Sequence, residues 1–302
     1  MYVLIGGGSI KGRILKGIGG FYYVYAEDGV TYECKAKGRF RKEGVKPMPG
    51  DFVMFTPPEQ TVGGSIDEIL PRLNQLPRPM IANIDLLLIV ISASDPKADL
   101  QLVDKLLLYA GYNHIRAAVA LNKIDSVCEK SRIPQEYQGS GIQFLEVSAR
   151  SGEGLDELKQ LLKGKFTCFA GQSAVGKSTL LNAISPALKL ETGEMSRKTA
   201  RGRHTTRHSE LLLLPELEAV VADTPGFSIL ECMEIEPEEL RMYYPEFILL
   251  QGQCRFDGCL HVREPQCCVK QAVEAGKISE GRYERYLKLL QELIERRENR
   301  YV

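Results

Sequence analysis

The spacing of hydrophobic and polar positions changes twice along the chain, and each change marks a predicted domain boundary. Up to about residue 70, short segments alternate apolar and polar side chains and are separated by Gly-Gly, Asp-Gly and Pro-Gly pairs, which favours β-strands joined by turns. The predicted strands cover 11–15, 21–25, 30–34 and 51–55. Short strands rich in aromatic and β-branched residues are typical of a small closed barrel of the oligonucleotide-binding (OB) type.

From residue 80 the pattern becomes one of buried strands that alternate with amphipathic helices. The predicted strands cover 84–92, 117–121, 142–147, 166–170 and 220–222, and the predicted helices cover 98–112, 155–162 and 177–184. This alternation predicts a mostly parallel, doubly wound α/β sheet, in which ligands bind beyond the carboxyl ends of the strands.

After residue 231 the chain carries acidic turns, a cluster of Cys and His residues, and a charged helix predicted over 279–299. Leu287, Leu290 and Ile294 share one face of that helix, and we expect them to form a packing stripe. The predicted organisation is therefore a barrel over 1–70, an α/β domain over 71–230 and a helical domain over 231–302.

Composition narrows the class of protein. The charges of the 39 basic and 39 acidic residues cancel, so any surface that binds nucleic acid has to be local. The basic stretch over 35–46 is one candidate, and it fits a solvated loop equally well. No apolar run reaches the roughly 18 residues of a membrane span, and the first residues do not resemble a secretion signal, so we expect a cytoplasmic protein with no membrane association. Half of the 8 cysteines lie within 254–268, which indicates a reducing compartment and a local use of thiols.

A complete phosphate-binding loop follows the predicted strand 166–170. Glycines allow backbone N–H groups to converge on phosphate oxygens, and the helix N-terminus adds its positive end. Lys177 is expected to reach the β- and γ-phosphates as a catalytic group, and Ser178 is expected to ligate Mg²⁺. The predicted nucleotide-binding residues of this loop are Gly171, Gln172, Ser173, Ala174, Val175, Gly176, Lys177, Ser178 and Thr179. A glycine-rich turn that arose by chance is the alternative, which the strand, loop and helix context disfavours.

The segment NKID at 122–125 is the predicted base reader. A carboxylate can accept two parallel hydrogen bonds from N1–H and N2–H₂ of guanine, and adenine has no such donor pair, so Asp125 should select guanine. Asn122 is expected to brace neighbouring loops, and Lys123 to pack its stem along the base. The four-residue pattern alone also fits a helix cap, but Ser148 and Ala149 after the next strand support the first interpretation, because a backbone N–H there could meet the guanine O6.

The segment DTPG at 223–226 completes the predicted nucleotide site. Asp223 is expected to hold Mg²⁺ through water and the Gly226 N–H to bind the γ-phosphate, so that loss of this phosphate frees the following loop. In isolation the pattern often means a plain β-turn, but a phosphate loop that ends 45 residues before Asp223 argues against a plain turn. Because the base-reading segments precede the phosphate loop, which reverses the Ras-like order, the domain is predicted to be circularly permuted.

Cys254, Cys259, His261 and Cys267 supply three thiols and one imidazole within 14 residues. This set matches a closed, structural zinc site with no open position for a substrate. Cys268 is adjacent and could compete with Cys267 as the fourth ligand. Buried free cysteines are the alternative, which the local density and the interposed His disfavour.

Together these motifs resemble those of the circularly permuted small ribosomal subunit biogenesis GTPases, the RsgA family. The resemblance covers the whole chain and rests on NKID at 122–125, GQSAVGKS at 171–178, GRHTT at 202–206, DTPGF at 223–227 and the Cys/His cluster. It implies an OB-type barrel, a permuted Ras-like P-loop GTPase domain and a C-terminal zinc domain, with Cys267 as the fourth zinc ligand. It also implies GTP hydrolysis that the small (30S) ribosomal subunit stimulates during its late maturation.

A basic loop over 196–209 lies between the phosphate loop and the DTPG segment. We expect it to close over the γ-phosphate and Mg²⁺ with Thr205 or Thr206 as a metal ligand, and its cations could contact ribosomal RNA or simply keep a disordered loop soluble. Ras-like enzymes orient the attacking water with a Gln after DxxG, but Phe227 stands there in this chain, which predicts slow intrinsic hydrolysis. His204 is the candidate to orient that water, and the resemblance indicates the same residue, although a lone His in a basic loop also fits an RNA contact.

The sequence therefore predicts a monomeric, cytoplasmic GTPase that uses GTP, GDP, Mg²⁺ and one structural Zn²⁺ and that binds ribosomal RNA and the small ribosomal subunit. Two other classes of protein share some of these sequence features. A non-catalytic, GTP-gated RNA-binding module is favoured by Phe227, and an ATP-dependent enzyme is disfavoured by Asp125.

Overall fold

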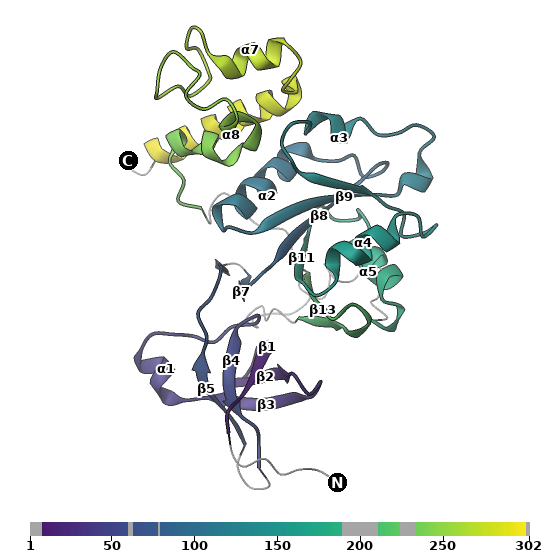
Figure 1. Cartoon of the computed structure of the whole chain (residues 1–302), viewed down its shortest axis with the longest axis vertical. Helices are drawn as coiled ribbons and strands as arrows, with labels where there is room; N and C mark the ends of the chain where they lie inside the picture. The colour runs from purple at the N-terminus through teal and green to yellow at the C-terminus, as the bar shows by residue number, and fades with distance from the viewer. Residues whose placement is uncertain (1–7, 60–62, 78, 189–210, 224–232, 300–302) are drawn as a thin grey trace.

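The computed structural model describes residues 8–59, 63–77, 79–188, 211–223 and 233–299 (Figure 1). A small barrel, a central sheet flanked by helices and a C-terminal group of helices follow one another along the long axis of the molecule, in chain order (Figure 1). The sheet therefore lies between the two units that the sequence predicts on either side of it.

The N-terminal unit is a closed barrel, which confirms the predicted OB-type architecture. Its strands run in the order β1-β2-β3-β5-β4, and β3 pairs with β5 in parallel. Their bounds are β1 Ile10–Ile18, β2 Phe21–Ala26, β3 Thr31–Ala36, β4 Phe52–Thr56 and β5 Gly64–Ile69. Ile14, Val24, Val53, Phe55 and Ile66 fill the interior and are fully buried. Strand β5 was not predicted, because the consecutive acids in its sequence GSIDEI break the apolar alternation.

The basic stretch over 35–46 contains a short helix, α1 Gly38–Lys42, rather than only a loop. Phe40 is buried in the barrel core and anchors this helix. Two of the basic side chains are held by β5, because Lys37 Nζ lies 2.7 Å from a carboxylate oxygen of Asp67 and Arg39 donates a hydrogen bond to the Asp67 carbonyl. Part of the positive charge is therefore used within the barrel itself.

A small hairpin joins the barrel to the sheet, formed by β6 Gln75–Pro77 and β7 Met80–Ala82. Asn83 Nδ2 donates to the carbonyl of Gly50 at 3.0 Å, which ties the hairpin to the barrel. Gly50 has a positive φ of 92°, and a Cβ there would lie 2.0 Å from the Ala82 carbonyl oxygen. Only glycine allows this close approach of the two units.

The central sheet has the strand order β10-β9-β8-β11-β13-β12. All neighbouring strands are parallel except β12, which runs antiparallel to β13 and was not predicted. The sheet strands are β8 Leu86–Ser92, β9 Arg116–Asn122, β10 Gln143–Glu146, β11 Phe166–Ala170, β12 Leu212–Leu214 and β13 Ala219–Asp223. The predicted mostly parallel sheet is confirmed, and the carboxyl ends of the parallel strands meet at one edge.

Helices cover both faces of the sheet, so β8 is buried along its whole length. Side chains of β8 alternate between two cores: Leu87 and Ile89 pack with α2 on one face, and Leu88 and Val90 pack with α4 and α5 on the other. The three helices are α2 Leu100–Tyr112, α4 Leu155–Leu162 and α5 Lys177–Ile184. Shorter helical segments are η1 Ile124–Ser126, α3 Ile133–Glu136, η2 Pro186–Leu188 and η3 Pro215–Leu217.

The C-terminal unit consists of η5 Pro237–Tyr243, α6 Pro245–Ile248, α7 Cys268–Glu274 and α8 Glu280–Glu298. Of the predicted stripe on α8, Leu290 is buried, whereas Leu287 and Ile294 are only half-buried at its edge. The buried face is instead built on Tyr286, Leu289, Leu290 and Leu293, together with two arginines, so the predicted stripe was displaced around the helix. Within the described ranges, no helix is both long enough and apolar enough to span a membrane.

Candidate nucleotide site and metal centre

The predicted phosphate loop occupies the turn between β11 and α5, at the carboxyl edge of the sheet. Strand β11 ends at Ala170 and α5 begins at Lys177. A Cβ on Gly171, whose φ is 132°, would lie 2.1 Å from the Val90 carbonyl oxygen, so the loop leaves β11 in a conformation that requires glycine. The N-cap residue of α5 is Gly176, which has no side chain to occupy the first N–H groups of the helix. These groups are available to an anion at the positive end of the helix.

Side chains of the loop divide into one buried anchor and several accessible groups. Val175 is fully buried in the core beneath the loop, Ser173, Ala174 and Thr179 are exposed, and Ser178 is half-buried. Lys177 Nζ lies 2.9 Å from the carbonyl of Gly171 and 2.7 Å from that of Gln172. The Lys177 side chain therefore reaches from the helix end of the loop back to its strand end.

The NKID segment contacts the phosphate loop directly, although about 50 residues separate the two in the chain. Asn122 Nδ2 donates to the carbonyl of Val175 at 2.9 Å, and Lys123 Nζ donates to the carbonyl of Ala174 at 2.8 Å. A Cβ on Gly176 would lie 2.5 Å from Asn122 Nδ2, so this glycine is needed for the contact. The two loops therefore form one continuous surface at the edge of the sheet.

Asp125 and Ser148 lie side by side in the adjacent loops. Ser148 Oγ donates to Asp125 Oδ1 at 2.6 Å, and this hydrogen bond lowers the pKa of the Asp125 carboxyl group. The carboxylate is therefore ionised at neutral pH, as an acceptor of two N–H bonds has to be. The Ala149 N–H donates to Asn122 Oδ1 at 3.2 Å, so the Asn122 side chain bridges the phosphate loop and the loop after β10.

Two further contacts of the site were missed in the sequence. The Asp95 carbonyl accepts a hydrogen bond from Lys123 Nζ at 2.5 Å, and the Asp99 N–H donates to Gln172 Oε1 at 2.9 Å. Asp99 is the N-cap of α2, so Gln172 links the phosphate loop to this helix. Both contacts use backbone atoms of the loop after β8, and no pattern of side chains could reveal them.

The remaining predicted nucleotide residues lie at the end of β13 and beyond it. Asp223 is the last residue of β13, and its backbone pairs with Phe169 of β11, next to the start of the phosphate loop. The other predictions, which concern His204, Thr205, Thr206 and Gly226 together with Phe227 and the basic loop over 196–209, lie outside the described residues.

The four predicted zinc ligands come together in the C-terminal unit. The ligand atoms of Cys254, Cys259, His261 and Cys267 all lie within 4.8 Å of one another. His261 Nδ1 lies 3.7 Å from the sulfur of Cys254 and 3.3 Å from that of Cys267. Zn–S and Zn–N bonds of normal length in a tetrahedron separate the two ligand atoms by about 3.6 Å. The spacing therefore fits a tetrahedral zinc ion held by these four residues.

The chemistry of the donors also fits a cation. Burial lowers the pKa of His261, which keeps the imidazole neutral and its lone pair available, and burial raises the pKa of Cys259 to about 12. A thiolate at that buried position requires a nearby positive charge. Backbone contacts fix the loop around the donors, since Tyr283 Oη donates to the His261 carbonyl at 2.6 Å and Arg241 donates to the Cys259 carbonyl at 2.8 Å. Cys268 lies beside the cluster, with its sulfur 3.0 Å from that of Cys254.

A buried ionic network joins the C-terminal unit to the sheet domain. Asp104 of α2 is 1% exposed, and its two carboxylate oxygens each lie 2.6 Å from a guanidinium nitrogen, one of Arg282 and one of Arg285. Glu246 pairs with Arg282 at 2.8 Å, and Glu136 pairs with Arg285 at 2.5 Å. The network holds α8 against α2, the helix whose N-cap Asp99 contacts the phosphate loop. Helix α8 also carries Tyr283 and Tyr286, whose hydroxyl groups donate to carbonyls of the metal-binding loop.

Comparisons with known proteins agree with this architecture. The RsgA GTPase family model matches residues 69–233, and the RsgA N-terminal domain model matches residues 11–64. The chain is 47% identical to the small ribosomal subunit biogenesis GTPase RsgA of Moorella thermoacetica, over 95% of this chain and 98% of the relative. It is 46% identical to the protein of the same name from Caldanaerobacter subterraneus, over 97% and 98% of the two chains.

Solved structures show the same similarity in three dimensions. YjeQ from Thermotoga maritima superimposes with a TM-score of 0.80 at 38% identity, over 95% of this chain and 99% of that one. YloQ, described as a circularly permuted GTPase, superimposes with a TM-score of 0.78 at 35% identity, over 95% and 96% of the chains. The predicted circular permutation agrees with the description of YloQ, and we conclude that the chain belongs to the RsgA family of circularly permuted GTPases.

Proposed function

We propose that this GTPase acts in late maturation of the small ribosomal subunit, which stimulates its GTP hydrolysis, and that it binds the subunit and its RNA in a GTP-dependent manner. The relatives at 46–47% identity carry the name small ribosomal subunit biogenesis GTPase, which supports the setting. The observation that carries the proposal is the contact of Asn122 and Lys123 with the phosphate loop, because it brings a guanine-reading segment and a phosphate-binding segment into one site.

Nucleotide binding follows from the arrangement of these loops. The backbone N–H groups at the start of α5 bind the phosphates of GTP, and the ammonium group of Lys177 moves from the loop carbonyls to the β- and γ-phosphates. Asp125 accepts the hydrogen bonds of N1–H and N2–H₂ of guanine, while Ser148 holds its carboxylate in place. A bound Mg²⁺ would neutralise charge on the β- and γ-phosphates, and Ser178 and Asp223 are the residues that would hold it.

Hydrolysis requires a group that orients water, and Phe227 cannot supply one. We assign this role to His204, with Thr205 or Thr206 as a further ligand of the magnesium ion. Because these residues belong to the basic loop, binding of that loop to ribosomal RNA would position them together at the γ-phosphate. This is the physical basis on which the subunit would stimulate turnover.

The C-terminal metal centre is proposed to hold one structural Zn²⁺ on Cys254, Cys259, His261 and Cys267. All four positions of a tetrahedron are then occupied by protein, so the ion stabilises the fold and binds no substrate.

The barrel is proposed as an RNA-binding surface of a monomeric, cytoplasmic protein. Basic side chains lie over aromatic rings on its strands, with Lys35 Nζ 4.8 Å from the Phe21 ring centre and Lys16 Nζ 5.1 Å from that of Tyr23. Phe21 and Tyr23 are half-buried, and cations beside partly exposed rings can bind phosphates and stack on bases.

The proposal is tested by multiple-turnover GTP hydrolysis with and without purified small ribosomal subunits. We expect stimulated turnover by the wild type and its loss in Lys177→Ala, while Lys163→Ala, which changes an exposed lysine at the end of α4, keeps wild-type turnover. Turnover that subunits leave unchanged would contradict the proposed partner. GTP binding without any turnover would favour the GTP-gated RNA-binding module instead, and equal competition by ATP would contradict the role of Asp125.

A further inference from the structure

Five sulfur and nitrogen donors crowd the metal centre, one more than a tetrahedral zinc ion can use. The extra donor is Cys268, whose sulfur lies 3.0 Å from the sulfur of Cys254 and 3.3 Å from the carbonyl oxygen of Leu250. A disulfide bond is about 2.05 Å long, so these two sulfurs need to approach by only about 1 Å to form one. Cys268 is therefore placed to react with a ligand of the metal.

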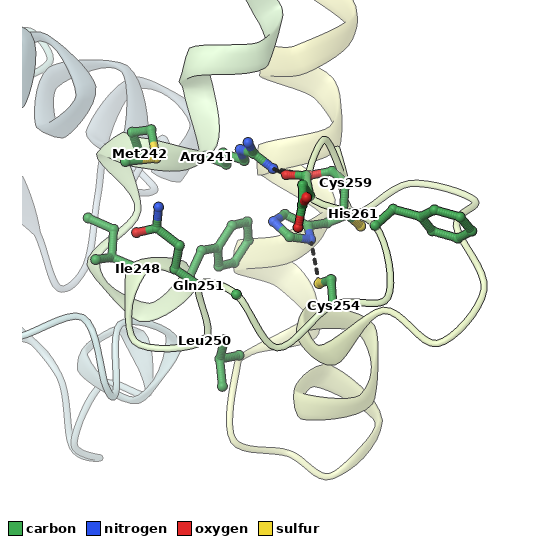
Figure 2. Close-up of a pocket in the computed structure, with 12 residues that line it drawn as sticks. Arg241, Met242, Ile248, Leu250, Gln251, Cys254, Cys259 and His261 are labelled. Carbon is green, nitrogen blue, oxygen red and sulfur yellow. Dashed lines mark hydrogen bonds between the residues drawn. The ribbon is translucent and has the colours of Figure 1, made fainter.

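Cys254 is also the most exposed of the three ligand cysteines. Cys259 is 1% exposed and Cys267 is 3% exposed, whereas Cys254 and Cys268 are half-buried. A cavity of about 200 Å³ opens beside the cluster, and Figure 2 shows that the ligands Cys254, Cys259 and His261 all line it. A water molecule occupies about 30 Å³, so the cavity has room for an oxidant as small as hydrogen peroxide.

We propose that Cys254 and Cys268 form a peroxide-sensitive pair that releases the metal reversibly, an inference that rests on the proposed zinc site. The Cys254 thiolate attacks one oxygen of hydrogen peroxide and becomes a sulfenic acid, and hydroxide leaves. The Cys268 thiol then attacks the sulfur of the sulfenic acid, a disulfide forms, and water leaves after proton transfer. In total one thiolate and one thiol are oxidised, one peroxide is reduced, and one hydroxide and one water are formed; a proton from solvent converts the hydroxide to water.

Loss of the Cys254 thiolate removes one of the four protein ligands, which weakens zinc binding and favours release of the ion. The disulfide also protects Cys254, because a sulfenic acid that no thiol captures proceeds to sulfinic acid, which thiol or phosphine reductants do not reverse. Cys268 thus acts as the resolving thiol of the pair.

The full chain is tested after purification with zinc, by exposure to hydrogen peroxide. Released zinc is measured with a chromogenic chelator, and disulfides are mapped by mass spectrometry after alkylation and trypsin digestion. Cleavage after Arg and Lys places Cys254 in peptide 242–255, Cys259 in 256–263, and Cys267 with Cys268 in 264–270. Alkylation of Cys267 and fragmentation between the two neighbours then identify the linked cysteine.

We expect one zinc ion to be released per disulfide formed between Cys254 and Cys268, and zinc binding to return after reduction and addition of zinc. Cys268→Ser should rebind at least about threefold less zinc after the same cycle, because its Cys254 loses the thiol that lies 3.0 Å away and is overoxidised more often. Cys128→Ser, which removes an exposed thiol outside the cluster, should recover as the wild type does.

A disulfide from Cys254 to Cys259 or Cys267 in the wild type overturns the pair, and so does full recovery of Cys268→Ser. A preparation that contains no zinc at the start refutes the proposed zinc site. The disulfide map of the wild type tests the pairing of Cys254 with Cys268 separately, because it does not depend on the zinc measurement.

Discussion

Replacing Asp104 with Ala should loosen the junction between the C-terminal unit and the sheet domain. The carboxylate is 1% exposed and contacts Arg282 and Arg285, and Tyr137 Oη donates a hydrogen bond to it at 2.6 Å. Removing one partner from a buried ionic network costs about 3–5 kcal/mol, because the remaining charges stay out of water. Each arginine keeps one carboxylate, Glu246 or Glu136, so we expect the lower end, about 3 kcal/mol.

The matched control is Lys105→Ala, at the next position of the same helix. Lys105 also pairs with α8, through Glu292 at 2.9 Å, but its side chain is 26% exposed and that of Glu292 is 40% exposed. Such a solvated pair contributes at most about 1 kcal/mol. The comparison therefore separates burial of the charges from the mere presence of an ion pair between the two helices.

The assay is hydrogen exchange of the α8 amides followed by mass spectrometry, which reports local opening without the assumption of two-state unfolding. A loss of 3 kcal/mol raises the exchange rate on the order of 100-fold, and a loss of 1 kcal/mol raises it about fivefold. Equal protection of α8 in the two variants would refute the reasoning.

Three further predictions concern the two sites. Ser148→Ala should weaken GDP binding about fivefold to tenfold, because the Asp125 carboxylate loses a hydrogen bond. The serine also lowers the pKa of Asp125, so as the pH falls the variant should lose GDP binding at a higher pH than the wild type does. Titration calorimetry at several pH values measures both effects. Gly176→Ala should reduce nucleotide affinity at least about tenfold, because the new Cβ meets Asn122. Gly252 also has a positive φ, of 77°, but open space surrounds it, so Gly252→Ala should bind nucleotide as the wild type does in the same titration. Chelation of the metal should lower the melting temperature, and unchanged calorimetric melting of fully demetallated protein would contradict a structural metal.

Several elements were predictable because their causes are local. Strands β8, β9 and β11 are nearly continuous apolar runs, and α4 and α5 keep the bounds read from their periodicity. The glycines of the phosphate loop had to occupy backbone conformations that other residues avoid, and that requirement leaves a pattern in the sequence.

Other elements depend on partners that are distant in the chain. Strand β5 carries Asp67, which is acceptable in a barrel because Lys37, Ser9 and Thr56 surround its carboxylate. The buried face of α8 includes Arg282, which pattern analysis assigns to solvent because arginines are rarely buried without a partner. The partner of Arg282 is Asp104, which lies 178 residues earlier in the chain, and the sequence does not indicate that the two side chains meet.

By itself, then, the sequence predicted the chemistry that we propose for each segment: phosphate binding at 171–178, guanine selection at Asp125, and metal ligation by the Cys/His cluster. Only the tertiary structure decided which segments act together, through the contact of Asn122 with Val175 and the approach of Cys268 to Cys254. The physical reason is that backbone conformation and hydrophobic period are properties of neighbouring residues, whereas the burial of a charge or the pairing of two thiols depends on groups that only folding brings within a few ångströms.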